Sequence, residues 1–148
     1  MRNTFIFTVL AVMILSSFSK KQESINNYQL SGKQEITLDS TKWWLTKIIY
    51  TADSFTEVST KKAFIKFNKA DGKISGNGSC NSFGGKLTIN GNNLSLDNIF
   101  STKMYCDEVQ SIENEFFRQL EKVTRYEIKG KILLLFEGYN LVLEFEAG

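Results

Sequence analysis

The stretch SGNGSCNSFGGKLTINGNNLSLDNIFSTKMYC, residues 75–106, decides the fold because it contains both cysteines and most of the candidate sites of close backbone approach. Cys80 lies among four glycines, which are Gly76, Gly78, Gly84 and Gly85. Glycine has no Cβ, so it permits positive φ and close packing of neighbouring backbone. Cys106 follows a hairpin signal and precedes a helical pattern. Since the chain has no other cysteine, Cys80 and Cys106 are each other's only candidate partners.

The composition of the chain excludes several classes of function. The 148 residues include 18 basic and 16 acidic side chains, and the formal net charge is +2. This near balance argues against a nucleic-acid-binding or strongly membrane-adsorbing surface over the whole protein. The sequence has no histidine, so it offers no Ser-His or Cys-His pair and no imidazole metal ligand.

The N-terminus has the order of a secretory signal. Arg2 precedes an apolar run over residues 4–18, and Ser17 and Ser19 are small residues suited to cleavage before Lys20. A retained membrane anchor is the alternative, but a span needs about 20 apolar residues and this run is shorter. The signal exit has no cysteine to accept a lipid, so we predict a periplasmic or secreted protein without lipidation. The predicted organisation is a signal peptide at 1–19, a polar lead-in at 20–40 and one domain at 41–148.

Strand signals dominate the rest of the chain. TKWWLTKIIY, residues 41–50, is rich in aromatic and β-branched residues and predicts a well-buried strand. Strict alternation would place Trp44, Thr46, Ile48 and Tyr50 on one face and Trp43, Leu45, Lys47 and Ile49 on the other. KILLLF, residues 131–136, predicts a strand buried on both faces. LVLEFE, residues 141–146, predicts that Leu141, Leu143 and Phe145 point inward.

Four dipeptides that end in glycine predict hairpin turns: Asp71-Gly72, Asn90-Gly91, Lys129-Gly130 and Glu137-Gly138. Helical spacing occurs in one segment, residues 107–123, with an apolar stripe of Val109, Ile112, Phe116, Leu120 and Val123. Asp107 is the predicted N-cap of this helix. The predicted fold class is therefore α+β and mainly antiparallel β, a small curved sheet or partly closed barrel built from hairpins with one helix packed on it.

These motifs resemble the META domain, or HslJ-like, family of bacterial envelope proteins. A Trp-x-Leu opening, a Gly-Cys-Asn segment, a Thr-x-Met-Ala-Cys segment and a helix with Glu, an aromatic residue and Leu are typical of that family. The matching residues outside the helix are Trp43, Leu45, Gly76, Cys80, Asn81, Gly85, Thr102, Met104 and Cys106, and Ser79 stands where the family usually has glycine. Glu113, Phe116 and Leu120 suit the helix. The resemblance implies an antiparallel β fold with one helix, a disulfide between the cysteines, and a role in envelope, heat-stress or antibiotic tolerance. It supplies no catalytic residues.

Several residues have both a chemical and a structural interpretation. Cys80 and Cys106 favour a structural disulfide over a reactive thiol or a metal site, because an exported thiol with one partner normally oxidises. Glu113 and Glu115 lie mainly off the apolar stripe, so we interpret them as solvated rather than as an acid-base pair. The lysines between residues 61 and 73 are a candidate binding patch for anionic lipid or polysaccharide, or else the defence of an edge hairpin against aggregation. They are Lys61, Lys62, Lys66, Lys69 and Lys73.

Together these observations predict an exported META-type domain that is not an enzyme and needs no metal or other cofactor. We expect it to support envelope integrity by binding an envelope protein or surface component. Nucleic acid is not an expected partner, membrane contact is at most peripheral, and the protein is expected to be a monomer. The alternatives are a carrier of a small apolar ligand inside the β fold and an envelope hydrolase that uses carboxylates.

Overall fold

The structure is a computed structural model that describes residues 36–39, 41–59 and 62–148. The predicted signal peptide and residues 20–35 of the lead-in lie outside the described residues. Within the described part, the elements in chain order are β1 (Trp43–Thr51), β2 (Ser54–Glu57), β3 (Phe64–Asn68), β4 (Lys73–Asn77), β5 (Ser82–Asn90), β6 (Asn93–Ser101), α1 (Gln110–Leu120), β7 (Arg125–Lys129), β8 (Ile132–Glu137) and β9 (Asn140–Ala147). No helix among these residues has the length and apolar character required to cross a bilayer.

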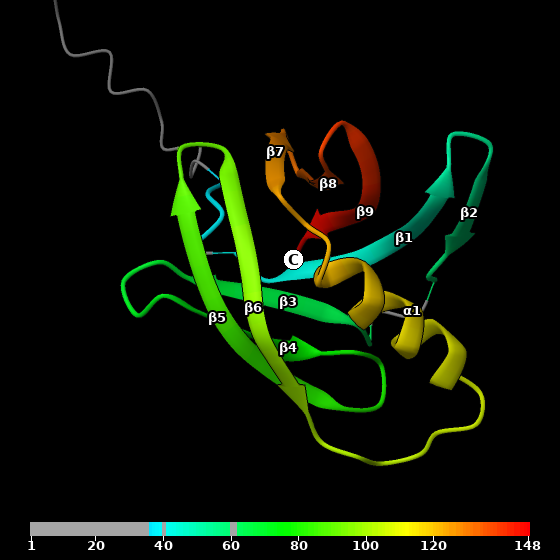
Figure 1. The fold of residues 1–148 in the computed structure, drawn as a ribbon. Helices are drawn as coiled ribbons and strands as arrows, with labels where there is room; N and C mark the ends of the chain where they lie inside the picture. The colour runs from blue at the N-terminus through cyan, green and yellow to red at the C-terminus, as the bar shows by residue number, and fades with distance from the viewer. Residues whose placement is uncertain (1–35, 40, 60–61) are drawn as a thin grey trace, which may run out of the picture. The chain divides into compact units, whose positions relative to one another are not determined.

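The strands form one antiparallel sheet that closes into a ring. Their order is β2-β1-β3-β4-β5-β6-β7-β8-β9, and β9 also pairs with β1. Strand β2 is paired only to β1 and so projects from the ring as a hairpin with it (Figure 1). The contact between β6 and β7 is narrow, because a single residue pair, Asn93 with Arg125, joins them. The predicted fold class, a mainly antiparallel sheet with one helix packed on it, is confirmed.

The core lies between the inner face of the ring and α1. Phe116 of α1 is fully buried and makes edge contacts with Phe83 of β5 and Phe145 of β9, at ring-centroid distances of 5.8 and 6.1 Å. These two strands are far apart in the strand order, so the helix fills the space between opposite parts of the ring. The other fully buried apolar side chains include Trp43, Leu45, Ile48, Ile65, Leu120, Leu133, Leu135 and Leu143.

A β-bulge changes the faces of β1 from those predicted by simple alternation. The pairing of β1 with β9 shifts between Leu45 and Lys47, which leaves Thr46 as an extra residue on β1. One extra residue reverses the alternation beyond it. The core face of β1 is therefore Trp43, Leu45 and Ile48, and the prediction that Ile48 lies on the opposite face from Leu45 was wrong.

A second bulge alters the prediction for β9. The pairing of β8 with β9 shifts between Leu135 and Phe136, and Val142 is the extra residue on β9. Val142 is buried and Leu141 is only half-buried, so the inward position predicted for Leu141 was wrong, whereas Leu143 and Phe145 are fully buried as predicted. Strand β8 is not buried on both faces, because Ile132 and Leu134 alternate as half-buried residues with buried neighbours.

All four predicted hairpins are present, although their loops differ in detail. Gly91, Gly130 and Gly138 each occupy the first position of a two-residue loop with φ near +60°, where glycine has no steric penalty. The β3–β4 loop instead has four residues, 69–72, because Asn68 pairs with Lys73. Asn68 and Asp71 close this longer loop through two hydrogen bonds that involve their side chains.

Helix α1 begins later than predicted. Val109 precedes its first turn and no side chain caps it, so Asp107 is not the N-cap. The Asp107 carboxylate instead accepts a hydrogen bond from the Tyr105 hydroxyl at 3.1 Å. The disulfide at Cys106 and the hydrogen bonds of Met104 hold the loop before α1 to the β4–β5 loop. These contacts set the path of the chain into the helix, and no side chain caps its first turn.

Candidate functional site

A buried carboxylate, that of Glu113, lies among the residues that match the sequence motifs. The Glu113 side chain projects from α1 and is 1% exposed. The backbone N–H groups of Cys80 and Asn81 donate to Glu113 Oε2 at 3.0 and 2.6 Å, and the Asn81 side-chain amide donates to Oε1. The prediction that Glu113 lies on a solvated face was therefore wrong. Its carboxylate is the hydrogen-bond partner of the loop between β4 and β5.

Asn81 connects that loop to the segment after β6. Its side-chain Oδ1 accepts hydrogen bonds from the Thr102 hydroxyl at 2.7 Å and from the Met104 N–H at 2.8 Å. Its Nδ2 also donates to the Met104 carbonyl at 2.9 Å. Asn81 is 3% exposed, and these bonds satisfy both ends of its amide. The motif residues Asn81, Thr102 and Met104 thus form one structural contact.

The predicted disulfide spans the same two segments. Cys80 and Cys106 are bonded, with a Cα–Cα distance of 6.0 Å and 26 residues of sequence separation. We call the combination of this disulfide with Glu113 and Asn81 the loop joint. Its hydrogen bonds and disulfide connect the β4–β5 loop to α1 and to the segment after β6.

The backbone at positions 78 and 79, just before Cys80, favours glycine for two different reasons. A Cβ on Gly78 would lie 2.7 Å from Glu113 Oε2 and 2.7 Å from the Phe117 ring, so any side chain there would displace the carboxylate. Ser79 has φ of 109°, in the left-handed region that favours glycine. The Ser79 N–H is bonded to the Asn77 side chain at 2.8 Å, which helps to hold this conformation. This backbone shape favours glycine at position 79, where this chain has serine.

The remaining motif residues lie in the core or in close backbone contacts. Trp43 is fully buried and its indole N–H donates to the Leu38 carbonyl at 3.1 Å, while Leu45 is 1% exposed. A Cβ on Gly76 would lie 2.1 Å from the Phe64 carbonyl oxygen, so only glycine fits between β3 and β5. Trp44 is half-buried on the outer face, where the Lys42 ammonium lies 3.7 Å from its ring centroid.

The candidate lysine patch lies on a sheet face rather than at an edge. Lys66 on β3 and Lys73 on β4 are exposed, while the adjacent residues Ile65 and Ile74 are buried. Both strands are paired on both sides, so the interpretation of an edge hairpin defended by lysines does not apply. Lys62 and Lys69 are exposed in the segments that flank β3, and Lys61 lies outside the described residues.

Strand pairing adds a lysine that the local sequence pattern did not include. Lys86 on β5 is exposed and lies directly opposite Lys73 on β4. Phe100 on β6 lies opposite Gly84, is 70% exposed, and covers the space that Gly84 leaves. We define the lysine face as Lys66, Lys73, Lys86 and Phe100. A shallow hollow of about 600 Å³ lies on this face, with Lys73, Lys86 and Phe100 in its lining.

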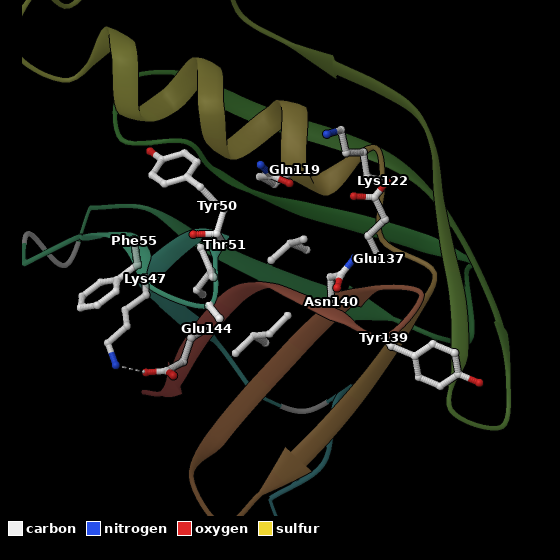
Figure 2. A pocket seen from close by; sticks show the side chains of 14 residues that line it. Lys47, Tyr50, Thr51, Phe55, Gln119, Lys122, Glu137, Tyr139, Asn140 and Glu144 are labelled. Atoms are coloured by element: carbon white, nitrogen blue, oxygen red, sulfur yellow. Dashed lines mark ion pairs between the residues drawn. The ribbon is translucent and has the colours of Figure 1, made fainter.

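A separate pocket of about 740 Å³ lies where three hairpin or helix ends meet (Figure 2). The β1–β2 hairpin supplies Tyr50 and Phe55, the C-terminal end of α1 and the residues after it supply Gln119 and Lys122, and the β8–β9 hairpin supplies Asn140 among others. No local sequence pattern marks these residues as a site. They come from three distant parts of the chain, so only the closure of the ring brings them together.

The fold and the loop joint define a class of small antiparallel β domains with one helix and a disulfide between the β4–β5 loop and the segment before the helix. This chain belongs to the META domain family, which matches residues 34–147. The resemblance inferred from its motifs is confirmed.

The solved structures similar to this chain include the following two. One is an NMR structure of a protein from Burkholderia xenovorans, with 20% identity and a TM-score of 0.64, covering 75% of this chain and 83% of that one. The other is a DUF4847 family protein from Bacteroides vulgatus, with 19% identity and a TM-score of 0.53, covering 74% of this chain and 93% of that one. At these identities the likeness shows the fold alone. No match was found among curated proteins.

Proposed function

We propose that this protein is an exported, non-catalytic META domain that supports envelope integrity under heat or antibiotic stress by docking on an anionic membrane surface. The lysine face is the docking surface. The observation that carries the proposal is the direct opposition of Lys73 and Lys86 on paired strands. Like charges directly opposite each other destabilise a sheet, and a negatively charged partner converts this cost into a favourable interaction.

The charges on this face are available to an external partner. Within the described residues, no ion pair involves Lys66, Lys73 or Lys86. They lie on three adjacent strands, so the positive charge is spread over an area, and it exceeds the single negative charge of Asp97, which lies opposite Lys86 on β6. An array of acidic headgroups matches that arrangement, and each lysine near such a surface contributes about 1 kcal/mol.

Exposed apolar groups favour a bilayer over a soluble polyanion. Phe100 has no hydrogen-bonding group, yet it is 70% exposed beside the lysines. Met104 and Tyr105 follow within five residues and are 58% and 75% exposed. Aromatic and apolar side chains among lysines are typical of protein surfaces that enter the headgroup region of a membrane.

The alternative of an apolar carrier receives less support than docking. Inside the ring, Trp43, Phe116 and Phe145 are fully buried and fill the space between the sheet and α1. A ligand there would have to displace these side chains, at the cost of their packing. The interior is therefore better described as a core than as a binding cavity.

The hydrolase alternative receives less support from the carboxylates that the structure describes in the pocket. Glu137 and Glu144 both line the pocket of Figure 2, but Glu137 is exposed and Glu144 forms an ion pair with Lys47 at 3.2 Å. Neither has the buried, unpaired setting in which a carboxyl group serves as a general acid. On β7, hydrogen bonds from Arg125 and Lys129 lower the pKa of the Glu127 carboxyl, which is the direction opposite to the one an acid catalyst needs.

Docking is tested by vesicle sedimentation with phosphatidylcholine vesicles and with vesicles that also contain phosphatidylglycerol. We expect binding only to the anionic vesicles, and we expect it to fall at about 1 M salt, where the Debye length is about 3 Å. The double variant K73Q/K86Q should lower the partition coefficient by roughly 30-fold, because each lysine contributes about 1 kcal/mol to the binding free energy.

The matched control for this test is K122Q/K131Q, which removes the same charge from two exposed lysines outside the lysine face. The control should bind anionic vesicles almost as well as the wild type. Equal losses in the two double variants would mean that net charge alone drives adsorption, and wild-type binding by K73Q/K86Q would refute the docking surface.

Export is tested separately by the intact mass of the protein from its native envelope fraction, before and after reduction and alkylation. We expect a chain that begins at Lys20 and lacks two thiol hydrogens. A disulfide in a small domain supports this expectation, because disulfides persist in oxidising compartments. A full-length mass with two free thiols in that fraction would contradict both processing and export.

A further inference from the structure

The pocket of Figure 2 lies among three irregularities of the sheet. Tyr50 is an extra residue on β1 where the pairing with β2 shifts between Ile49 and Thr51. Tyr50 and the bulged Val142 of β9 both line the pocket, and the third bulge, at Thr46, immediately precedes the lining residue Lys47. Bulges redirect side chains and are over-represented next to functional sites. The three bulges therefore set the directions of side chains in or beside the lining of this one pocket.

The formal charges in the lining of the pocket cancel. Two lysines, Lys47 and Lys122, and two glutamates, Glu137 and Glu144, line it. Lys47 and Glu144 are already paired at 3.2 Å, which Figure 2 shows as a dashed line. Because the lining has no net charge, it gives neither an anionic nor a cationic ligand a net electrostatic attraction. The electrostatics therefore favour an uncharged ligand.

Gln119 provides an unsatisfied acceptor in the wall of the pocket. The residue is 5% exposed, and its Nε2 donates to Glu115 Oε1 at 2.6 Å. This bond sets the orientation of the amide, since the reversed amide would bring two oxygen atoms together. Gln119 Oε1 has no hydrogen-bond partner among the described residues. A buried acceptor without a partner destabilises a protein, so a ligand that supplies an O–H or N–H donor gains affinity once a small shift of the amide exposes Oε1 to the pocket.

Aromatic side chains flank the polar groups. Tyr50 and Phe55 stand on one side of the pocket, and they remain 45% and 52% exposed (Figure 2). Tyr139 stands at the rim formed by the β8–β9 hairpin and is 95% exposed. Large exposed rings beside amide groups match a ligand that has both apolar C–H faces and polar edges. The Asn140 amide adds a further donor and acceptor to the lining.

We propose that this pocket binds an uncharged sugar unit of a glycan. A pyranose ring offers C–H faces for Tyr50 or Phe55, and its hydroxyl groups, or the N–H of an acetamido substituent, offer a donor for Gln119 Oε1. An apolar ligand would leave that acceptor unpaired, and the balanced charges of the lining give an acidic sugar no net attraction. The volume of about 740 Å³ lies within the range of known ligand pockets. This site is distinct from the lysine face and does not depend on the docking proposal.

The experiment is an NMR titration of the 15N-labelled mature protein with chitotetraose and maltotetraose, which are neutral, and with tetragalacturonate, which is anionic. We expect saturable shifts for a neutral sugar at the Gln119 and Asn140 side-chain amides and at the Tyr50 backbone amide. The anionic sugar should bind at least about tenfold more weakly, as expected when one repulsive charge is introduced.

Two variants and one control identify the site. Y50A should weaken binding of the neutral sugar about fivefold or more through the loss of ring contact. Q119M keeps the size of the side chain but removes the acceptor, so it should weaken binding by roughly fivefold while the melting temperature is unchanged or rises. Y105A removes a tyrosine that is exposed but outside the pocket, and it should bind like the wild type.

Three results would overturn the proposal. One is the absence of saturable shifts with both neutral sugars, which would mean that the pocket does not bind an uncharged sugar. Another is wild-type affinity in both Y50A and Q119M, which would place any binding elsewhere. The third is preferential binding of tetragalacturonate with shifts at Lys73 and Lys86, which would assign the sugar to the lysine face.

Discussion

Replacement of Glu113 by alanine is expected to lower the free energy of unfolding by about 3–5 kcal/mol, because the variant leaves three buried donors without an acceptor. The donors are the N–H groups of Cys80 and Asn81 and the Asn81 side-chain amide. Each unsatisfied buried donor costs about 1–3 kcal/mol, and partial entry of water reduces the sum. The midpoint of thermal unfolding should fall by at least about 12 °C, since 1 kcal/mol corresponds to roughly 4–8 °C in small domains.

Urea unfolding of the oxidised protein measures this effect, with E115Q as the matched control. Glu115 lies two residues along the same helix and pairs with the exposed Arg118, so its neutralisation should cost less than about 1 kcal/mol. E113Q retains the shape of the side chain but directs an NH₂ group at N–H donors. Its loss of unfolding free energy should lie between those of E115Q and E113A. A loss in E113A as small as that in E115Q would show that the loop joint does not depend on this carboxylate.

Loss of the disulfide is expected to have an effect of similar size. In the chain-entropy model, a bridge that closes 26 residues contributes about 3.5 kcal/mol by restricting the unfolded chain. The variant C80S/C106S should unfold at correspondingly lower urea concentration. Reduction of the wild type by a thiol provides a second measurement that introduces no new side chain, and stability unchanged by both treatments would contradict the expected role.

The two largest effects are also expected to be coupled. The disulfide and Glu113 both hold the loop at Cys80, so the loss of either allows that loop to move and weakens the other contact. Contacts that share a structural element deviate from additivity by about 0.5–3 kcal/mol. A double-mutant cycle with E113A and C80S/C106S measures this coupling. Strict additivity would mean that the two contacts act independently.

Much of the fold could be predicted because the relevant signals are local. Gly91, Gly130 and Gly138 occupy turn positions with positive φ, and a glycine between two strand-like runs indicates such a turn without knowledge of the rest of the chain. Phe116 and Leu120 follow the helical period and are fully buried. The pairing of Cys80 with Cys106 needed only the count of cysteines and the inference of export.

The failed predictions concern residues whose environment comes from distant segments. Glu113 lies off the apolar stripe of α1, and nothing in its neighbourhood in sequence shows that two backbone N–H groups 32 and 33 residues away will enclose its carboxylate. The bulge at Thr46 depends on how β1 pairs with β9, almost a hundred residues later. Lys86 joined the lysine face only through its position opposite Lys73.

The sequence by itself determined the antiparallel class, the helix, the disulfide and the family, because turn glycines, hydrophobic periods and cysteine spacing act over short distances. The tertiary structure alone decided which polar groups are buried and which residues share a surface or a pocket. Closure of β9 onto β1 sets the register that produces the bulges and brings Tyr50, Gln119 and Asn140 to one pocket. A pairing register is a property of two strands together, and one shifted residue exchanges core and surface along the whole strand. For this reason the pocket, and the place of Lys86 beside Lys73, became visible only in the folded protein.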